Sequence, residues 1–157
     1  MTVIAWDGTT LAVDSLSISS GLTGTATKLH LVEHGPFRGL VTGCGYSRNI
    51  VAMRHWFERG LDGADFPDLG DERNEATLVT VDWRCRVCEY SGSPYAIEES
   101  TVPYAWGSGD ALAIGAMEMG ATAVEAVEVA CRRSSECGGA ILFARPDEGV
   151  IRRTDDA

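Results

Sequence analysis

Alternating hydrophobic and polar residues predict that the first third of the chain forms short β-strands. Asp7-Gly8, between the first two strands, is a strong signal for a two-residue hairpin turn, so we expect the N-terminus to be held in a sheet. A stretch rich in Ser, Gly and Thr, residues 15–25, separates this hairpin from the next strands. The predicted strands are residues 2–6, 9–13, 27–32 and 38–42.

The third of these strands alternates in a way that assigns its two faces. Residues two apart on a strand point to the same side, so Leu29 and Leu31 are expected to face the core. Lys28 and His30 then point to the other side. The turn into the fourth strand is predicted at residues 34–36, a His-Gly-Pro sequence.

Helical periodicity predicts three helices in the rest of the chain. In the first, Ile50, Met53 and Phe57 are spaced as one apolar face. Thr122 is placed to cap the third, and Glu125 completes a capping box. The predicted helices are residues 46–60, 109–119 and 122–133.

Four more strands are expected, a hairpin of residues 76–83 and 85–90 and two short strands at 139–144 and 150–152. Residues 62–75, which are rich in Gly, Pro and acidic residues, are expected to form a surface loop. Runs of strands followed by runs of helices favour an α+β protein with helices layered on antiparallel sheets.

The composition is typical of one globular domain covering residues 1–157, with 45% hydrophobic and 23% charged residues. The formal net charge is −10, whereas nucleic-acid binding depends on clustered Lys and Arg, so no nucleic-acid partner is expected. No run approaches the roughly 18 consecutive apolar residues of a membrane-spanning helix, and no export signal is evident. We therefore expect a cytoplasmic protein with no membrane partner.

The cysteines and histidines predict neither a metal site nor a cofactor. Five cysteines in a chain without an export signal are expected to be reduced thiols. Cys85 and Cys88 have the spacing of half a zinc motif, but no second ligand pair matches it, and a strand would point them to opposite faces. Residues 43–45, Gly-Cys-Gly, are too short for a nucleotide-binding fingerprint.

Lys28 is the only lysine of the chain, which has twelve arginines. A lysine differs from an arginine in its compact amine, whose pKa is easily moved. On composition alone, a site that requires such an amine and a surface lysine kept by chance are about equally good explanations.

Thr2 follows Met1, and its small side chain normally allows methionine aminopeptidase to expose its amine. An N-terminal threonine carries a hydroxyl nucleophile and a primary amine on one residue. An α-amine has a reference pKa of about 7.7–8.0, which suits proton transfer near neutral pH. Many proteins begin with Met-Thr, so this feature needs independent support.

Five short motifs occur in order at residues 2–5 (TVIA), 11–14 (LAVD), 27–29 (TKL), 40–43 (LVTG) and 106–109 (WGSG). In order and spacing they resemble the landmarks of proteasome β-subunits and HslV, which are N-terminal nucleophile (Ntn) hydrolases. The resemblance covers nearly the whole chain, and the opening is most similar to that of small proteasome-like proteins of phages and prophages. It implies a four-layer αββα sandwich, with two antiparallel sheets between helix layers.

The resemblance also implies roles for individual residues. Thr2 matches the catalytic threonine, Lys28 the catalytic lysine, and Asp14 the acid that holds the lysine. Gly43 matches the glycine whose backbone N–H binds the oxyanion, and Ser108 matches the serine that hydrogen-bonds near the threonine amine. An ammonium beside the hydroxyl lowers the cost of forming an alkoxide, and the carboxylate keeps that ammonium charged and aimed.

Ser134 departs from the family pattern. Proteasome β-subunits have an Asp four residues before a Gly-Gly pair, where it helps to orient the N-terminal amine, and this chain has Ser134 there. A serine accepts a hydrogen bond but supplies no charge, so activity is expected to be weaker or differently arranged. Cys137 takes the place of a second serine of the family.

A threonine-type peptidase or amidase is the activity that the resemblance implies. Thr2 Oγ would attack an amide carbonyl, the Thr2 amine or Lys28 would take the proton, and water would then release the acyl group. Two alternatives stay open, a non-catalytic ring-forming scaffold associated with a phage, favoured by Ser134, and a small-molecule amidase. The resemblance further implies a homo-oligomeric ring and an ATPase unfoldase partner.

Large apolar residues of the predicted helices also favour assembly. A core layered between two sheets need not cover all of them, and exposed apolar patches usually mark interfaces. We expect cyclic or stacked rings with the Thr2 sites facing an enclosed cavity. The residues are Met53, Trp56, Phe57, Met117 and Met119.

Overall fold

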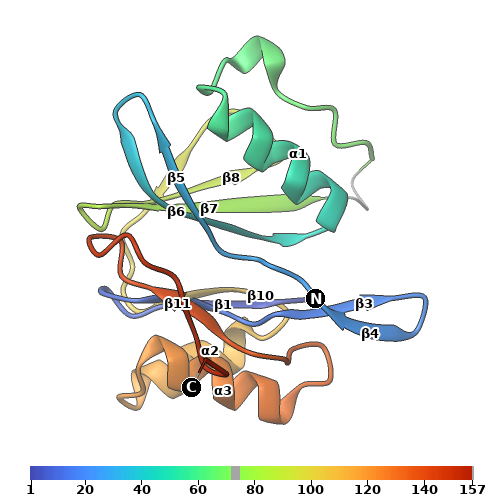
Figure 1. Cartoon of the computed structure of the whole chain (residues 1–157), viewed down its shortest axis with the longest axis vertical. Helices are drawn as coiled ribbons and strands as arrows, with labels where there is room; N and C mark the ends of the chain where they lie inside the picture. Colours follow the sequence, from blue (N-terminus) through green and yellow to red (C-terminus); the bar gives the residue numbers. More distant parts are fainter. Residues whose placement is uncertain (72–74, 157) are drawn as a thin grey trace.

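The computed structural model describes residues 1–71 and 75–156. Its elements stack in four layers, with two antiparallel sheets in the middle and helices outside, as Figure 1 shows. The α+β class and the αββα sandwich expected from the sequence are confirmed. The elements are β1 (Val3–Trp6), β2 (Leu11–Val13), β3 (Leu16–Ser19), β4 (Leu22–Thr25), β5 (His30–His34), β6 (Phe37–Gly45), α1 (Ser47–Glu58), the 3₁₀ turn η1 (Gly63–Asp65), β7 (Ala76–Asp82), β8 (Val87–Ser91), β9 (Ile97–Glu99), β10 (Tyr104–Gly107), α2 (Asp110–Glu118), α3 (Ala123–Arg133), β11 (Leu142–Ala144) and β12 (Arg152–Arg153).

The first sheet has the strand order β10-β1-β2-β11-β12. Every residue of β1 is buried, because one face of the strand meets α2 and α3 while the other meets the core between the sheets. Small side chains such as Ala113, Ala126 and Ala130 line the helix contact, which lets the two helices pack closely on the sheet. The strand that follows Thr2 is therefore held from both sides.

The second sheet has the order β5-β6-β7-β8-β9, and α1 packs on its outer face. Met53, Trp56 and Phe57 of α1 are buried there. Leu40 and Val79, on the inner face, belong to the core shared with the first sheet. The two sheets are thus joined by an apolar layer, and the site described below lies at one end of it.

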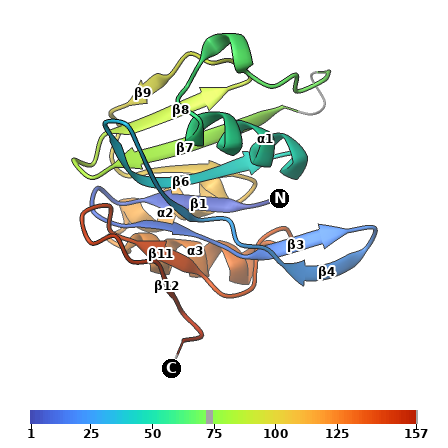
Figure 2. The same cartoon turned by 45° about the horizontal axis from the view of Figure 1, so that its top comes forward.

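The hairpin β3–β4 forms a separate two-stranded sheet that projects from the side of the sandwich, as Figure 2 shows. The sequence predicts no strands here, because its Ser, Gly and Thr content is typical of a loop. All of β4 is exposed, and Leu22 at its start is 76% exposed. The N-terminus lies beside the base of this hairpin in both views.

The hairpin of residues 2–13 and all three predicted helices are confirmed, with helix ends within two residues of those expected. The capping box of Thr122 and Glu125 is present. The predicted number of strands is wrong, because the sequence predicts neither the hairpin β3–β4 nor the strands β9 and β10. The strand β10 matters most, since it pairs with β1 and leads into Ser108.

Two side-chain placements differ from the expectation. Leu31 is 44% exposed, while its neighbour Val32 is buried. The strand begins only at His30, so its alternation does not extend back to Leu29, which is buried before the strand starts. Cys85 lies in the turn between β7 and β8 with a φ of 65°, and not on a strand.

Most of the large apolar residues expected at an interface are buried within one chain. The α1 residues among them belong to the core between α1 and the second sheet, and Met117 of α2 belongs to the core between the first sheet and its helices. Met119, at the end of α2, is 88% exposed. Only Met119 therefore fits the expectation that some of these residues stay exposed, and the other four are part of the core: Met53, Trp56, Phe57 and Met117.

Three further features concern the described residues as a whole. None of their helices has the length and apolar character needed to cross a bilayer. No group of three or more His, Cys, Asp or Glu side chains within residues 1–71 and 75–156 is arranged to hold a metal ion. None of the five cysteines is joined in a disulfide.

Candidate active site

The β1–β2 hairpin places Asp14 beside Thr2. In this antiparallel pair Ile4 lies opposite Val13, so the next position along places Asp14 opposite Val3. The backbone N–H of Asp14 donates to the Val3 carbonyl oxygen at 3.3 Å. Asp14 is therefore one residue away from Thr2 across the hairpin, at the end of the sheet.

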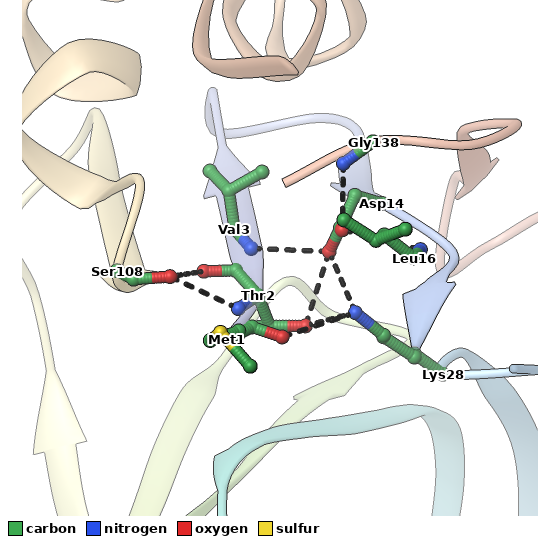
Figure 3. A network of polar contacts seen from close by, with 8 residues as sticks. All are labelled: Met1, Thr2, Val3, Asp14, Leu16, Lys28, Ser108 and Gly138. Carbon is green, nitrogen blue, oxygen red and sulfur yellow. Dashed lines mark hydrogen bonds and ion pairs between the residues drawn. The ribbon is translucent and has the colours of Figure 1, made fainter. Parts of the chain in front are cut away.

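Lys28 reaches the same point from the segment that enters the second sheet. Its Nζ lies 2.5 Å from Oγ1 of Thr2 and 3.0 Å from Oδ1 of Asp14. Oγ1 of Thr2 in turn donates to Oδ1 of Asp14 at 3.0 Å. Figure 3 shows the three side chains closing a triangle of polar contacts.

The carboxylate of Asp14 is completely buried and faces only hydrogen-bond donors. Such an environment suits an ionised carboxylate, which accepts through both oxygens and donates none. The donors come from four separate parts of the chain, so Asp14 also ties the ends of the site together. They are Thr2 Oγ1, Val3 N and Lys28 Nζ on Oδ1, and Leu16 N and Gly138 N on Oδ2.

The ammonium of Lys28 is fully engaged. An ammonium has three donors, and those of Lys28 contact Asp14, Thr2 and the Met1 carbonyl oxygen, the last at 3.3 Å. The lysine side chain is only 14% exposed. Its charge is therefore directed at the Thr2 hydroxyl and not at solvent.

The backbone nitrogen of Thr2 is held on the other side. It donates to Oγ of Ser108 at 3.1 Å, and the Ser108 hydroxyl donates back to the Thr2 carbonyl oxygen at 3.2 Å. The N–H of Gly109 also donates to that carbonyl, at 3.3 Å. Gly107 has a φ of 94°, and a Cβ there would lie 2.3 Å from the same oxygen, so only glycine permits this close approach.

Gly43 lies in β6, beyond the last residue that pairs with β5. A Cβ at Gly43 would lie 2.8 Å from both Ile50 Cδ1 and the Thr77 carbonyl oxygen, so α1 and β7 leave no room for a side chain. Gly43 lines the same pocket as Thr2 and Lys28. The structure thus brings Thr2, Asp14, Lys28, Gly43 and Ser108 to one site.

Ser134 lies farther out, at the C-terminal end of α3, where its Oγ accepts from the Glu136 N–H at 3.2 Å. Its link to Thr2 runs through two intermediates, Cys137 and Ser108. Burial raises the pKa of the Cys137 thiol, and the nearby Asp14 charge raises it further. Hydrogen bonds of the thiol with Ser108 and Ser134 lower this pKa. Ser134 is therefore a neighbour of the site, with no hydrogen bond to Thr2.

Two pockets flank Thr2. The larger, about 440 Å³, contains Lys28 and Gly43, while the smaller, about 320 Å³, contains Ser108. Met1 and Thr2 line both of them. Met1 thus stands between two hollows that meet at the candidate nucleophile.

The larger pocket also has a titratable side chain, that of His30. Burial lowers the pKa of His30 below its ordinary value, and the cation of Arg54 lowers it further, against the opposing effect of Glu58. Arg54 lines the same pocket and is paired with Glu58 at 2.9 Å. At neutral pH the pocket therefore presents a neutral imidazole beside a compensated ion pair.

Several groups at the site have no side-chain signal in the sequence. The Met1 carbonyl and the N–H groups of Leu16 and Gly138 act through the backbone, so residue identity does not reveal them. Cys44 lines both pockets, and burial raises the pKa of its thiol to about 11. A single cysteine between two glycines gives no indication of that position.

No protein-family model and no curated protein matches the chain. Solved structures do share its fold. Eukaryotic HslV from Trypanosoma brucei superposes with a TM-score of 0.64 at 16% identity, over 92% of this chain and 98% of the other. Two Anbu (ancestral beta-subunit) structures are also similar. Anbu from Yersinia bercovieri has a TM-score of 0.68 at 13% identity, over 99% of this chain and 88% of the other. Anbu from Hyphomicrobium sp. strain MC1 has a TM-score of 0.67 at 12% identity, over 99% of this chain and 89% of the other.

At these identities the similarity defines a fold class, that of the proteasome-like HslV and Anbu subunits. It leaves the activity to be argued from the site itself. The resemblance to phage proteins stays a prediction.

Proposed function

We propose that the chain is a threonine-type Ntn hydrolase of amide bonds, with Thr2 as the nucleophile once Met1 is removed. The observation that carries this proposal is the contact of one hydroxyl, Thr2 Oγ1, with both the Lys28 ammonium at 2.5 Å and the Asp14 carboxylate at 3.0 Å. A buried triangle of this kind is costly to desolvate and contributes little net stability, so it is better explained by chemistry.

The freed amine of Thr2 is the proton acceptor in this mechanism. The Lys28 ammonium has no lone pair, so it stabilises charge and does not take the proton. Thr2 Oγ1 attacks the amide carbonyl carbon, a C–O bond forms, and the hydroxyl proton passes to the amine. The C–N bond then breaks as the amine returns that proton to the leaving nitrogen, and water hydrolyses the ester and regenerates Thr2.

Two groups stabilise the negative charge that develops on the way. Lys28 faces Oγ1 as it loses its proton, and the Gly43 N–H is proposed to bind the carbonyl oxygen of the substrate as it becomes an oxyanion. Gly43 supports this role by lining the pocket beside Thr2 with no side chain in the way. Ser108 positions the amine through its hydroxyl.

Met1 keeps the site inactive while it is present. Its peptide bond ties up the Thr2 nitrogen, and its carbonyl oxygen accepts a hydrogen bond from Lys28. A free amine and a free Lys28 donor therefore appear in the same step, when Met1 is removed.

The test compares two forms of the chain, one released from a cleavable N-terminal fusion with Thr2 as its first residue and one that retains Met1. A peptide epoxyketone reacts with the hydroxyl and the amine of an N-terminal threonine, so its mass should add to the first form only. Thr2→Ala in the first form should abolish labelling, whereas Thr2→Ser should retain it. An unlabelled Thr2-first chain at large inhibitor excess would contradict the proposal.

A second candidate is a non-catalytic scaffold of the same fold. It is favoured by Ser134, which supplies no charge near the amine and forms no hydrogen bond with Thr2. The labelling experiment separates the two, because a scaffold takes up no inhibitor in either form.

The proposal extends to substrate, assembly and location. The substrate is a peptide or a small amide, the chain acts as a homo-oligomeric ring in the cytoplasm, and an ATPase unfoldase delivers protein substrates to it. Support for assembly comes from exposed apolar side chains at the hairpin β3–β4 and the end of α2, Leu22 at 76% and Met119 at 88%.

A further inference from the structure

The two pockets beside Thr2 differ in chemistry. The larger has an apolar wall that includes Ile18, Ile50 and Leu78, beside the polar side chains of His30 and Arg54. The smaller is lined mainly by small residues, and Glu75 is the one charged side chain among the described residues around it. Glu75 is exposed and forms no ion pair with another described residue, so its charge is available to a ligand.

The positions of Lys28 and Ser108 assign a direction to the site. As Figure 3 shows, Lys28 approaches Thr2 from the side of its hydroxyl and Ser108 from the side of its backbone nitrogen. In the proposed mechanism the amine returns a proton to the leaving nitrogen, so the leaving group has to lie on the amine side. The Ser108 pocket therefore receives the leaving half of the substrate, and the Lys28 pocket receives the acyl half.

While it is present, Met1 separates the two pockets that would receive the halves of the substrate. It lines both pockets, as do Thr2, Cys44 and Gly45. Removal of Met1 joins the two pockets into one groove that passes over Thr2. A substrate chain lying in that groove brings the residue after its scissile bond next to Glu75.

Charges of both signs act on Cys44, which lines the smaller pocket. Burial raises the pKa of its thiol, the N-terminal charge lowers it, and the carboxylates of Glu89 and Asp110, each with a smaller effect than the N-terminal charge, raise it. The chain as a whole has a net charge of −10. The carboxylate of Glu75 in the pocket lining and the acidic balance of the chain are the features that favour a cation there.

We propose that the smaller pocket is a leaving-group subsite for a positively charged residue, Lys or Arg directly after the scissile bond, and that Glu75 selects it. This inference rests on the proposed hydrolase function. It adds a substrate class, with an apolar residue on the acyl side and a cationic one on the leaving side.

The test uses the Thr2-first chain and three quenched fluorogenic peptides, identical except for Lys, norleucine or Glu after a scissile Leu. We expect kcat/KM to be about fivefold higher for the Lys peptide than for the norleucine peptide, the size of effect of a solvent-accessible ion pair. Glu75→Gln should remove this preference, and Glu75→Lys should make the Glu peptide the best substrate. Glu118→Gln, the same change at an exposed position at the end of α2, should leave the preference intact.

A binding measurement tests the subsite even without turnover. A labelled peptide with an N-terminal Lys, the product of the leaving half, should bind to the Thr2→Ala chain about fivefold tighter than to the same chain with Glu75→Gln added. A norleucine peptide should not distinguish the two chains. Salt at about 1 M should reduce the difference by screening.

The outcomes separate the two proposals. Cleavage of all three peptides at equal rates, together with equal binding, overturns the Glu75 subsite and leaves the hydrolase proposal standing. Cleavage of none, with the binding difference present, overturns the hydrolase proposal and retains a cation site at Glu75.

Discussion

The ammonium of Lys28 donates to the hydroxyl oxygen of Thr2 at 2.5 Å. That same hydroxyl donates its own hydrogen to the Asp14 carboxylate at 3.0 Å. A proton that leaves Thr2 Oγ1 therefore uncovers negative charge directly in front of a cation. Under the proposed function, changes at the two partners should separate catalysis from stability, because Lys28 contacts the proposed nucleophile and Asp14 also holds the surrounding backbone.

We expect Lys28→Arg to lower kcat/KM by about 100-fold or more while the chain stays folded. A guanidinium keeps the charge, but its planar fork does not fit a position where Nζ lies within 3.0 Å of both Thr2 Oγ1 and Asp14 Oδ1. Fluorogenic peptide hydrolysis measures the loss, and circular dichroism checks the fold. Lys28→Met is the matched variant without charge, and an arginine variant with activity within about tenfold of the native chain would show that a compact amine is not required.

Asp14→Asn should lower the free energy of unfolding by about 3 kcal/mol, because it leaves a largely buried ammonium without its counter-ion. The new amide group would also point donor hydrogens at the N–H groups of Leu16 and Gly138 or at Lys28. Urea unfolding measures the change. Asp155→Asn, at an exposed acid, serves as the control and should leave stability nearly unchanged; a loss below about 1 kcal/mol for Asp14→Asn would contradict a structural role for its charge.

Gly107→Ala should lower the free energy of unfolding by about 1–3 kcal/mol and impair activity. The positive φ and the close Thr2 carbonyl oxygen force the backbone beside the nucleophile to move. Gly115→Ala is the matched control, since nothing lies within 4 Å of its Cβ position inside α2. That control should gain about 0.5–1 kcal/mol from helix propensity, and equal effects of the two changes in a thermal unfolding series would refute the contact with Thr2.

The imidazole of His30 should titrate below its reference pKa of about 6.5, because burial lowers its pKa and Arg54 lowers it further. Its contribution to stability is complete above pH 6.5 or so and is lost as the pH falls, since the unfolded chain then binds a proton that the folded chain resists. Between about pH 7.5 and 5.5 the native chain should therefore lose more stability than His30→Gln. An NMR titration midpoint at or above the reference value would disprove this.

Light scattering at micromolar concentration should give a mass above the 16.8 kDa of one chain. Leu22→Ser and Met119→Ser, separately, should shift the population toward the single chain if these exposed side chains lie at interfaces. A mass of one chain at every concentration would refute assembly and leave the site open to solvent.

The parts of the fold that the sequence predicts correctly have local causes. Asp7-Gly8 sets the first hairpin, and the Thr122–Glu125 box sets the start of α3. The meeting of Thr2, Asp14 and Lys28 follows from motif order and the resemblance, since no local pattern links positions so far apart.

The parts that the sequence does not predict depend on tertiary context. The strand β10 is four residues long and is stabilised by pairing with β1, a partner about a hundred positions away. Leu31 is exposed because the strand starts at His30, later than its alternation indicates. The donors to Asp14 from Leu16 and Gly138 are backbone groups, which every residue except proline has.

The hydrogen bond from Gly138 to Asp14 has a consequence for synthesis on the ribosome. Ribosomes add about 5–20 residues per second, so the nascent N-terminus waits several seconds before this donor leaves the exit tunnel. Until then the buried carboxylate of Asp14 lacks one of its hydrogen-bond donors, so the hairpin around Thr2 does not reach its final structure. We therefore expect the Thr2 hydroxyl to reach its final environment only when the polypeptide is nearly complete.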